Sequence, residues 1–294
     1  MPTNIPWTDE VWNPVTGCSS AGTGCDHCYA RRMANRLRGR CGYPKNRPFS
    51  VTLHPDKLSL PFKWKKPKRI FVDSMGDLFH VDVPERYIAA VFGVMALTPQ
   101  HTYIILTKRP RKAANWFSWL DGEAEDFVKE NQPNTCTEHL VRIREDLRRS
   151  ALVTSWPLKN VWILISAENN ESLYMRLPHL FRIPAAVRGI SLEPLLEWID
   201  LETHLDDLRK RCNALAAVYG SLYGDLKPQW VILGCESGPG RRSFKYDWAR
   251  EIRDCCVERD IRFYFKQAPD PRQPRKLIEM PELDEITWNQ FPKT

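Results

Sequence analysis

The sequence predicts an α/β fold, because short apolar segments rich in β-branched and aromatic residues alternate with helix-like segments along most of the chain. Some of these segments, such as residues 103–106 and 162–165, are apolar throughout, as expected of parallel strands that helices cover on both faces. Polar residues follow each segment where a strand would end. We therefore expect a (β/α)8 or partial TIM-like barrel with helical insertions; a doubly wound open sheet is the alternative.

Eight strands are expected, at residues 10–15, 49–53, 69–73, 102–106, 160–165, 187–192, 230–233 and 262–265. Helices are expected between them, at residues 29–38, 84–96, 110–119, 171–180 and 246–259. Residues 121–155 and 201–225 are charged and helix-prone, with too few apolar residues to build cores of their own, so we interpret them as helical insertions. The chain is then a single domain spanning residues 1–294, with a proline-rich surface arm at residues 268–275.

The composition is typical of a folded globular protein, with 43% hydrophobic and 27% charged residues. No run approaches the roughly 18 apolar residues that a membrane span requires, and the first residues lack the pattern of a signal peptide. We therefore expect a cytoplasmic protein without a membrane partner. Nine cysteines, an odd number in a chain of 294 residues, indicate a reducing compartment and metal or redox use of a subset.

Positive charge is concentrated near the start of the chain. The net charge is +7, and residues 29–69 contain thirteen Lys or Arg but one acid, Asp56. Such a stretch favours a nucleic acid as partner, because it would attract a polyanion to a site nearby. A solvated basic face has the same composition and is the alternative.

The clearest motif is a cysteine triplet directly after the first predicted strand. Cys18, Cys25 and Cys28 are spaced C-x6-C-x2-C, and glycines at positions 17, 22 and 24 allow the backbone between them to curl. Three thiolates on one loop are suited to a metal, and three ligands leave one metal position open, whereas a structural site uses four. A zinc site completed by His27 or Cys41 is the alternative.

Three cysteines, a helix after them and an α/β barrel behind resemble the radical S-adenosylmethionine superfamily. The first gap is three residues longer than the usual C-x3-C-x2-C of that superfamily. Six segments resemble more closely an uncharacterised phage and bacterial family usually regarded as radical-S-adenosylmethionine-like: WNPVTGC (12–18), DSMGDLFH (73–80), TPQHT (98–102), LTKRP (106–110), SLEPL (191–195) and GCESG (234–238).

The resemblance implies that Cys18, Cys25 and Cys28 bind a [4Fe–4S] cluster whose fourth iron binds S-adenosylmethionine. An electron from a donor such as a flavodoxin or ferredoxin would cleave this cofactor to methionine and a 5′-deoxyadenosyl radical. The radical would abstract hydrogen from an unknown substrate, for which the basic stretch suggests a nucleic acid or nucleotide. The competing interpretation is a non-catalytic zinc or iron–sulfur protein that binds nucleic acid.

Barrel enzymes carry their working residues at the carboxyl ends of strands. In the turn after the third predicted strand, Ser74 and Asp77 are expected to receive the cofactor's ammonium group. Lys108 and Arg109, after the fourth strand, are expected to bind its carboxylate.

Five further residues are expected to bind the cofactor: Glu168 and Asn169 at the ribose, His27 and Tyr29 near the adenine, and Ser166 after the same strand as Glu168. Catalytic residues facing the substrate are expected to be Glu193, Glu236 and Lys266. For any strand-end residue the alternative is a helix cap or a salt bridge. For Tyr29 it is a place in the core, and for His27 a zinc ligand.

Overall fold

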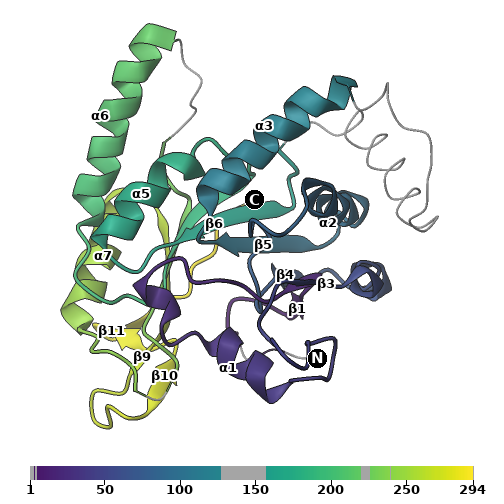
Figure 1. Cartoon of the computed structure of the whole chain (residues 1–294). Coiled ribbons are helices and arrows are strands. Elements are labelled where there is room, and N and C mark those ends of the chain that lie inside the picture. Colours follow the sequence, from purple (N-terminus) through teal and green to yellow (C-terminus); the bar gives the residue numbers. More distant parts are fainter. Residues whose placement is uncertain (1–2, 4, 127–156, 220–225, 239, 294) are drawn as a thin grey trace.

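The computed structural model describes residues 3, 5–126, 157–219, 226–238 and 240–293. Eight strands form one curled sheet in the order β1-β4-β5-β6-β7-β8-β9-β10, with helices between them (Figure 1). The pairs from β1 to β9 are parallel, and β10 is antiparallel to β9. The order begins at β1 and ends at β10, so the sheet is a half-barrel, which confirms the predicted α/β partial barrel.

The strands of this sheet are β1 (Glu10–Trp12), β4 (Arg69–Val72), β5 (Thr102–Thr107), β6 (Val161–Ser166), β7 (Val187–Leu192), β8 (Trp230–Gly234), β9 (Arg262–Pro269) and β10 (Leu277–Glu279). Seven of them match predicted strands. The helices are α1 (Tyr29–Arg36), α2 (Glu85–Leu97), α3 (Pro110–Asp126), α5 (Asn170–Leu180), α6 (Leu201–Tyr219) and α7 (Tyr246–Glu258). All five predicted helices are present, with some ends shifted.

One predicted strand does not belong to the sheet. Within residues 49–53 only β3 (Thr52–Leu53) forms, and it pairs with β2 (Val15–Thr16) in a separate two-stranded sheet. Both residues of β3 are only half-buried, whereas strands inside the main sheet are covered on both faces. The eighth place is taken by β10, which the sequence analysis missed because its three residues are half-buried or exposed and show no apolar run.

The prediction of an extended surface arm at residues 268–275 is also wrong. Strand β9 continues to Pro269, and a turn closed by the bond from the Asp270 N–H to the Lys276 carbonyl (2.9 Å) leads into β10. A second short antiparallel pair follows, formed by β11 (Glu282–Leu283) and β12 (Ile286–Thr287).

The two predicted insertions have different outcomes. Residues 121–126 end helix α3, and the remainder of the first insertion lies outside the described residues. Helix α6 connects β7 to β8 and contributes Leu201, Leu205 and Leu208 to the core. Its first half is therefore a crossover helix of the barrel rather than an insertion, because leucines at helical spacing supply the apolar stripe that such a helix buries.

The two faces of the sheet build different parts of the core. On β4, Ile70 and Val72 join the cluster that packs against α2 and α3, while Phe71 between them points to the opposite face. There it joins Trp162 and Trp230, whose rings meet edge to face at 5.6 Å, and these side chains fill the concave side. Figure 1 shows the helices α2, α3, α5, α6 and α7 around the outside. Among the described residues, no helix is both long and apolar enough for a membrane crossing.

Candidate functional site

The cysteines lie on a loop, residues 17–28, that crosses the carboxyl ends of the parallel strands; we call it the cysteine loop. It starts after β2, contains a short 3-10 helix (Thr23–Cys25) and leads into α1. Cys18, Cys25 and Cys28 are free thiols of intermediate exposure, whereas Cys41 is exposed beyond α1. The structure thus places the predicted cysteines where half-barrel and barrel enzymes carry their working groups.

Gly17 begins the loop in a conformation that excludes other residues. Its φ is +84°, and a Cβ there would lie 2.1 Å from the backbone oxygen of Ser50. We expect Gly17→Ala to lower the free energy of unfolding by more than about 2 kcal/mol, from backbone strain plus a clash that no rotamer relieves. Thermal unfolding measures this.

Gly240→Ala is the matched control, since Gly240 has a φ of +71° but no atom within 4 Å of a built Cβ. It carries only the conformational cost, about 1–2 kcal/mol. Equal losses in the two variants would show that contact with Ser50 does not hold the start of the cysteine loop.

Three groups of contacts, which we call anchors, hold the cysteine loop. The first, the Asp77 anchor, consists of Arg109 and Asp77. The Arg109 guanidinium donates to Cys18 Sγ (3.3 Å), to the Ser19 carbonyl (2.9 Å) and to Asp77 Oδ2 (3.1 Å). Asp77 is buried and also accepts from Thr107 Oγ1 at 2.8 Å. Burial lowers the pKa of Arg109, but the charges of Asp77 and Cys18 outweigh this and raise it. Burial and Asp77 raise the pKa of Cys18 to about 11, against the opposing charge of Arg109.

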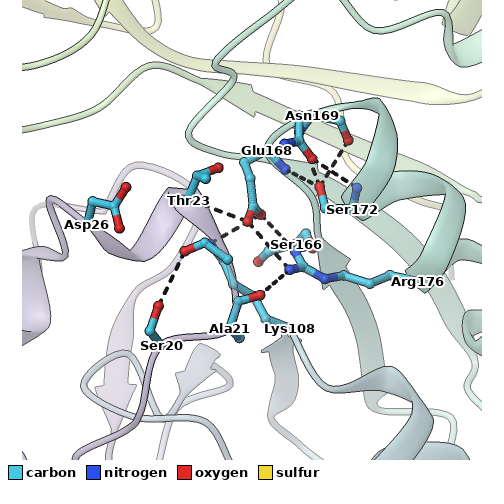
Figure 2. Close-up of polar contacts among 12 residues, drawn as sticks. Ser20, Ala21, Thr23, Asp26, Lys108, Ser166, Glu168, Asn169, Ser172 and Arg176 are labelled. Atoms are coloured by element: carbon cyan, nitrogen blue, oxygen red, sulfur yellow. Dashed lines mark hydrogen bonds and ion pairs between the residues drawn. The ribbon is translucent and has the colours of Figure 1, made fainter.

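The second is the Glu168 anchor, shown in Figure 2. Glu168 is 1% exposed and pairs with Arg176 Nη1 (2.7 Å) and Lys108 Nζ (3.3 Å). Arg176 Nη2 donates to the Ala21 carbonyl (2.6 Å), and the Gly24 N–H donates to Glu168 (3.4 Å). Burial raises the pKa of Glu168, but Arg176 and Lys108 outweigh it, so the pKa is lowered and the carboxylate is charged.

The third is the Glu236 anchor, at the end of β8. Arg242 donates to the buried Glu236 carboxylate through Nε (3.0 Å) and to the Thr23 carbonyl through Nη2 (2.8 Å). His27 Nδ1 lies 3.1 Å from the same carboxylate. Burial raises the pKa of Glu236, but the bonds from Arg242 and His27 outweigh it and lower the pKa. The three anchors together hold the cysteine loop near both ends and at its middle.

A fourth contact joins the strand ends on either side of β8. Lys266 on β9 forms an ion pair with Glu193, which follows β7. Gly234 on β8 lies between them, and a Cβ there would be 3.4 Å from Glu193 Cδ. This is an ordinary van der Waals distance, so Glu193 reaches across β8 directly over Gly234. Both charged side chains remain partly exposed, Lys266 at 15% and Glu193 at 18%.

The aromatic residue after the cysteines is not a core residue. Tyr29 is 44% exposed, and its hydroxyl donates to the Ser74 carbonyl. Ser74 Oγ in turn donates to Asn13 Oδ1 at 3.2 Å. Tyr29 and Ser74 thus lie together beside the cysteine loop.

Two predicted cofactor residues have local roles. Asn169 is the N-cap of α5, since its side chain accepts the Ser172 N–H at 2.9 Å in a capping box. This matches the capping alternative for Asn169. The Ser166 carbonyl accepts from Arg176 at 2.8 Å, so Ser166 supports the Glu168 anchor through its backbone.

Arg176, Arg242 and Asp73 lie at the site but were not predicted from the sequence. The two arginines lie on a helix and a loop, far from any motif. Asp73 directly follows β4 with a φ of +56°; its Oδ1 accepts the Val15 N–H at 2.8 Å, and its buried Oδ2 has no hydrogen-bond partner within the described part of the chain. Burial raises the pKa of Asp73 well above its usual value. Its position at the end of a predicted strand was the one feature of the sequence that could have indicated that Asp73 lies at the site.

Three thiols on a glycine-rich loop are a donor set that suits an iron–sulfur cluster, because soft sulfur ligands bind such irons. Among the described residues, no group of three or more His, Cys, Asp or Glu side chains is arranged to hold a metal ion. Cys18, Cys25 and Cys28 therefore match such a cluster in donor type and in loop, although their side chains are not in a metal-binding arrangement in this structure.

Fold and site define an α/β half-barrel protein with a cysteine loop fixed over the carboxyl ends of its strands. The chain belongs to the family described as "Protein of unknown function (DUF5131)", whose model matches residues 2–292. One solved structure similar to it is "Spore photoproduct lyase complexed with dinucleoside spore photoproduct", with 12% identity and a TM-score of 0.41. That match covers 85% of this chain and 62% of the other. No curated protein matches the sequence.

Proposed function

We propose that this protein is a radical S-adenosylmethionine enzyme, in which Cys18, Cys25 and Cys28 hold a [4Fe–4S] cluster. The observation that supports this most is the anchoring of the cysteine loop. Three strand ends of the half-barrel hold it through buried carboxylates paired with arginines. An anchored loop with three thiols positions a cluster at the strand ends, with one iron left for a small cofactor.

When bound, the cluster supplies the electron that cleaves S-adenosylmethionine and so starts hydrogen abstraction from the substrate. The chain's own residues hold and orient the cluster and the cofactor. Arg109 donates to the Cys18 sulfur and keeps positive charge beside it. Lys108 and Arg109 are the cations for the cofactor's carboxylate, and Tyr29 presents a half-exposed ring for its adenine.

The assignment of the cofactor's ammonium group changes with the geometry. Both Asp77 oxygens already accept from Thr107, Lys108 or Arg109, so this carboxylate serves chiefly to position Arg109. We assign the ammonium group to the Ser74 carbonyl, which accepts one bond from the Tyr29 hydroxyl and has a second lone pair. Glu193 and Lys266, partly exposed at neighbouring strand ends, are assigned to the substrate, with Glu236 supporting the cysteine loop.

Anaerobic purification tests the proposal. We expect about four irons and four sulfides per chain, and 5′-deoxyadenosine when S-adenosylmethionine is added with dithionite, flavodoxin or ferredoxin. Protein that holds zinc, contains no sulfide and leaves S-adenosylmethionine intact would exclude this function. It would support the second candidate, a zinc protein that binds nucleic acid, which the basic stretch at residues 29–69 favours.

A further inference from the structure

Three segments far apart in the sequence meet beside the cysteine loop. The Arg32 guanidinium of α1 lies against Gly238, where a Cβ would be 2.6 Å from its Nη2. The next residues of that loop reach the β9–β10 turn, because Arg241 donates to the carbonyls of Pro274 (3.3 Å) and Arg275. Arg242 then bonds to the cysteine loop at Thr23. In Figure 1, α1 and β10 lie on the same side of the molecule.

These segments present a set of cations that we call the basic rim: Arg36, Arg38, Arg40, Arg241, Lys245, Arg272, Arg275 and Lys276. All eight are exposed or half-buried. Within the described part of the chain, none of the eight has a carboxylate at ion-pair distance. No Asp or Glu occurs between residues 27 and 55, so the α1 part of the rim has no acidic neighbour in sequence.

The arginines on and just after α7 show the contrasting arrangement, because they are paired with carboxylates. Arg250 of α7 bonds to Asp247 and Asp284, and Arg259, directly after the helix, bonds to Glu202 and Asp206. A charged surface that only needs solubility has both signs interspersed, as on α7. The rim departs from that pattern next to the candidate active site, which indicates that its counter-charge comes from a ligand.

The chemistry of the rim favours a nucleic acid over an acidic protein. Six of its eight cations are arginines, whose planar forks bind phosphate oxygens in pairs. Two flat or flexible apolar side chains stand exposed where α1 leaves the cysteine loop, Tyr29 at 44% and Met33 at 40%. Exposed aromatic surface beside cations is the combination that binds unpaired bases and their phosphates.

We infer that a nucleic acid lies along the basic rim and presents one of its nucleotides to the cysteine loop as the substrate of the site. The substrate role rests on the proposed function, whereas binding to the rim does not. Only part of the basic stretch at residues 29–69 then belongs to the basic rim. Lys63, Lys65 and Lys66 lead into β4 at Arg69, at the amino ends of the parallel strands, opposite the cysteine loop.

Fluorescence anisotropy with labelled single-stranded DNA, single-stranded RNA and duplex DNA tests this on the full chain. Three variants make the same change in net charge: R36E/R38E/R40E at the end of α1 and just after it (the α1 variant), R272E/R275E/K276E on the β9–β10 turn (the turn variant), and the control K63E/K65E/K66E. Each replaces exposed side chains. We expect the α1 and turn variants to bind at least one nucleic acid about tenfold more weakly, with a salt slope smaller by about 2. The control should bind within about twofold of the parent protein.

Three results would overturn the inference: equal losses in all three variants, a loss in the α1 variant without one in the turn variant, or displacement by polyglutamate at equal charge concentration. The last would identify an acidic protein as the ligand. Circular dichroism checks that each variant folds. If a glutamate variant fails to fold, the same positions are changed to glutamine instead and the binding is measured on that variant. The assay needs neither reductant nor S-adenosylmethionine, so failure of binding and failure of cofactor cleavage are observed separately.

Discussion

Cys18→Ala, Cys25→Ala and Cys28→Ala are each expected to abolish binding of the iron–sulfur cluster and, with it, cleavage of S-adenosylmethionine. Loss of one thiolate leaves two protein ligands for a cluster that needs three. Iron and sulfide content and the electron paramagnetic resonance of the reduced protein measure the loss. We expect less than about a tenth of the parent's iron in each variant, since two thiolates hold such a cluster poorly.

Cys41→Ala is the matched control, since Cys41 is exposed and lies beyond α1. It should retain the parent's iron and sulfide. If Cys41→Ala loses metal as well, the site has four protein ligands and no open position, and the catalytic proposal fails.

Glu168→Ala is expected to cost about 3–5 kcal/mol of folding stability, because it leaves the guanidinium of Arg176 buried without its partner carboxylate. The same change removes the acceptor of the Gly24 N–H, so iron content should fall along with stability. Chemical denaturation measures the first effect. Glu202→Ala is the matched control, since Glu202 is 60% exposed in its pair with Arg259, and exposed pairs contribute about 0–1 kcal/mol. Equal losses in both variants would show that the Glu168 anchor has no special role.

The pH dependence of stability gives a second readout for Glu168. Its folded pKa is lowered below the usual 4.5, so the folded state favours the charged form. The resulting stability is complete above pH 4.5 and is lost as the pH falls through the folded pKa. Glu168→Gln should lose part of this acid dependence, because glutamine does not titrate. An unchanged slope of unfolding free energy against pH below 4.5 would contradict it.

The residues that the sequence placed at strand ends do converge, because parallel strands bring their carboxyl ends to one edge. That geometry holds for Asp77, Glu168 and Glu236, which lie in the loops that follow β4, β6 and β8. Their individual roles were not predictable in the same way. Whether a carboxylate faces a ligand or an arginine depends on where the arginine lies. The sequence pattern does not predict the positions of Arg176 and Arg242 in the fold.

Sequence patterns alone were enough to predict the alternation of strands and helices, the place of the cysteine triplet and the glycines that let its loop curl. These depend on local residue preferences and on the period of apolar residues, which the chain carries at each position. Only the tertiary structure decided that β10 rather than β3 joins the sheet, and that the Glu168 and Glu236 anchors hold the cysteine loop. The bonds of these anchors join residues 144 and 219 positions apart, and their formation depends on the packing of the whole half-barrel.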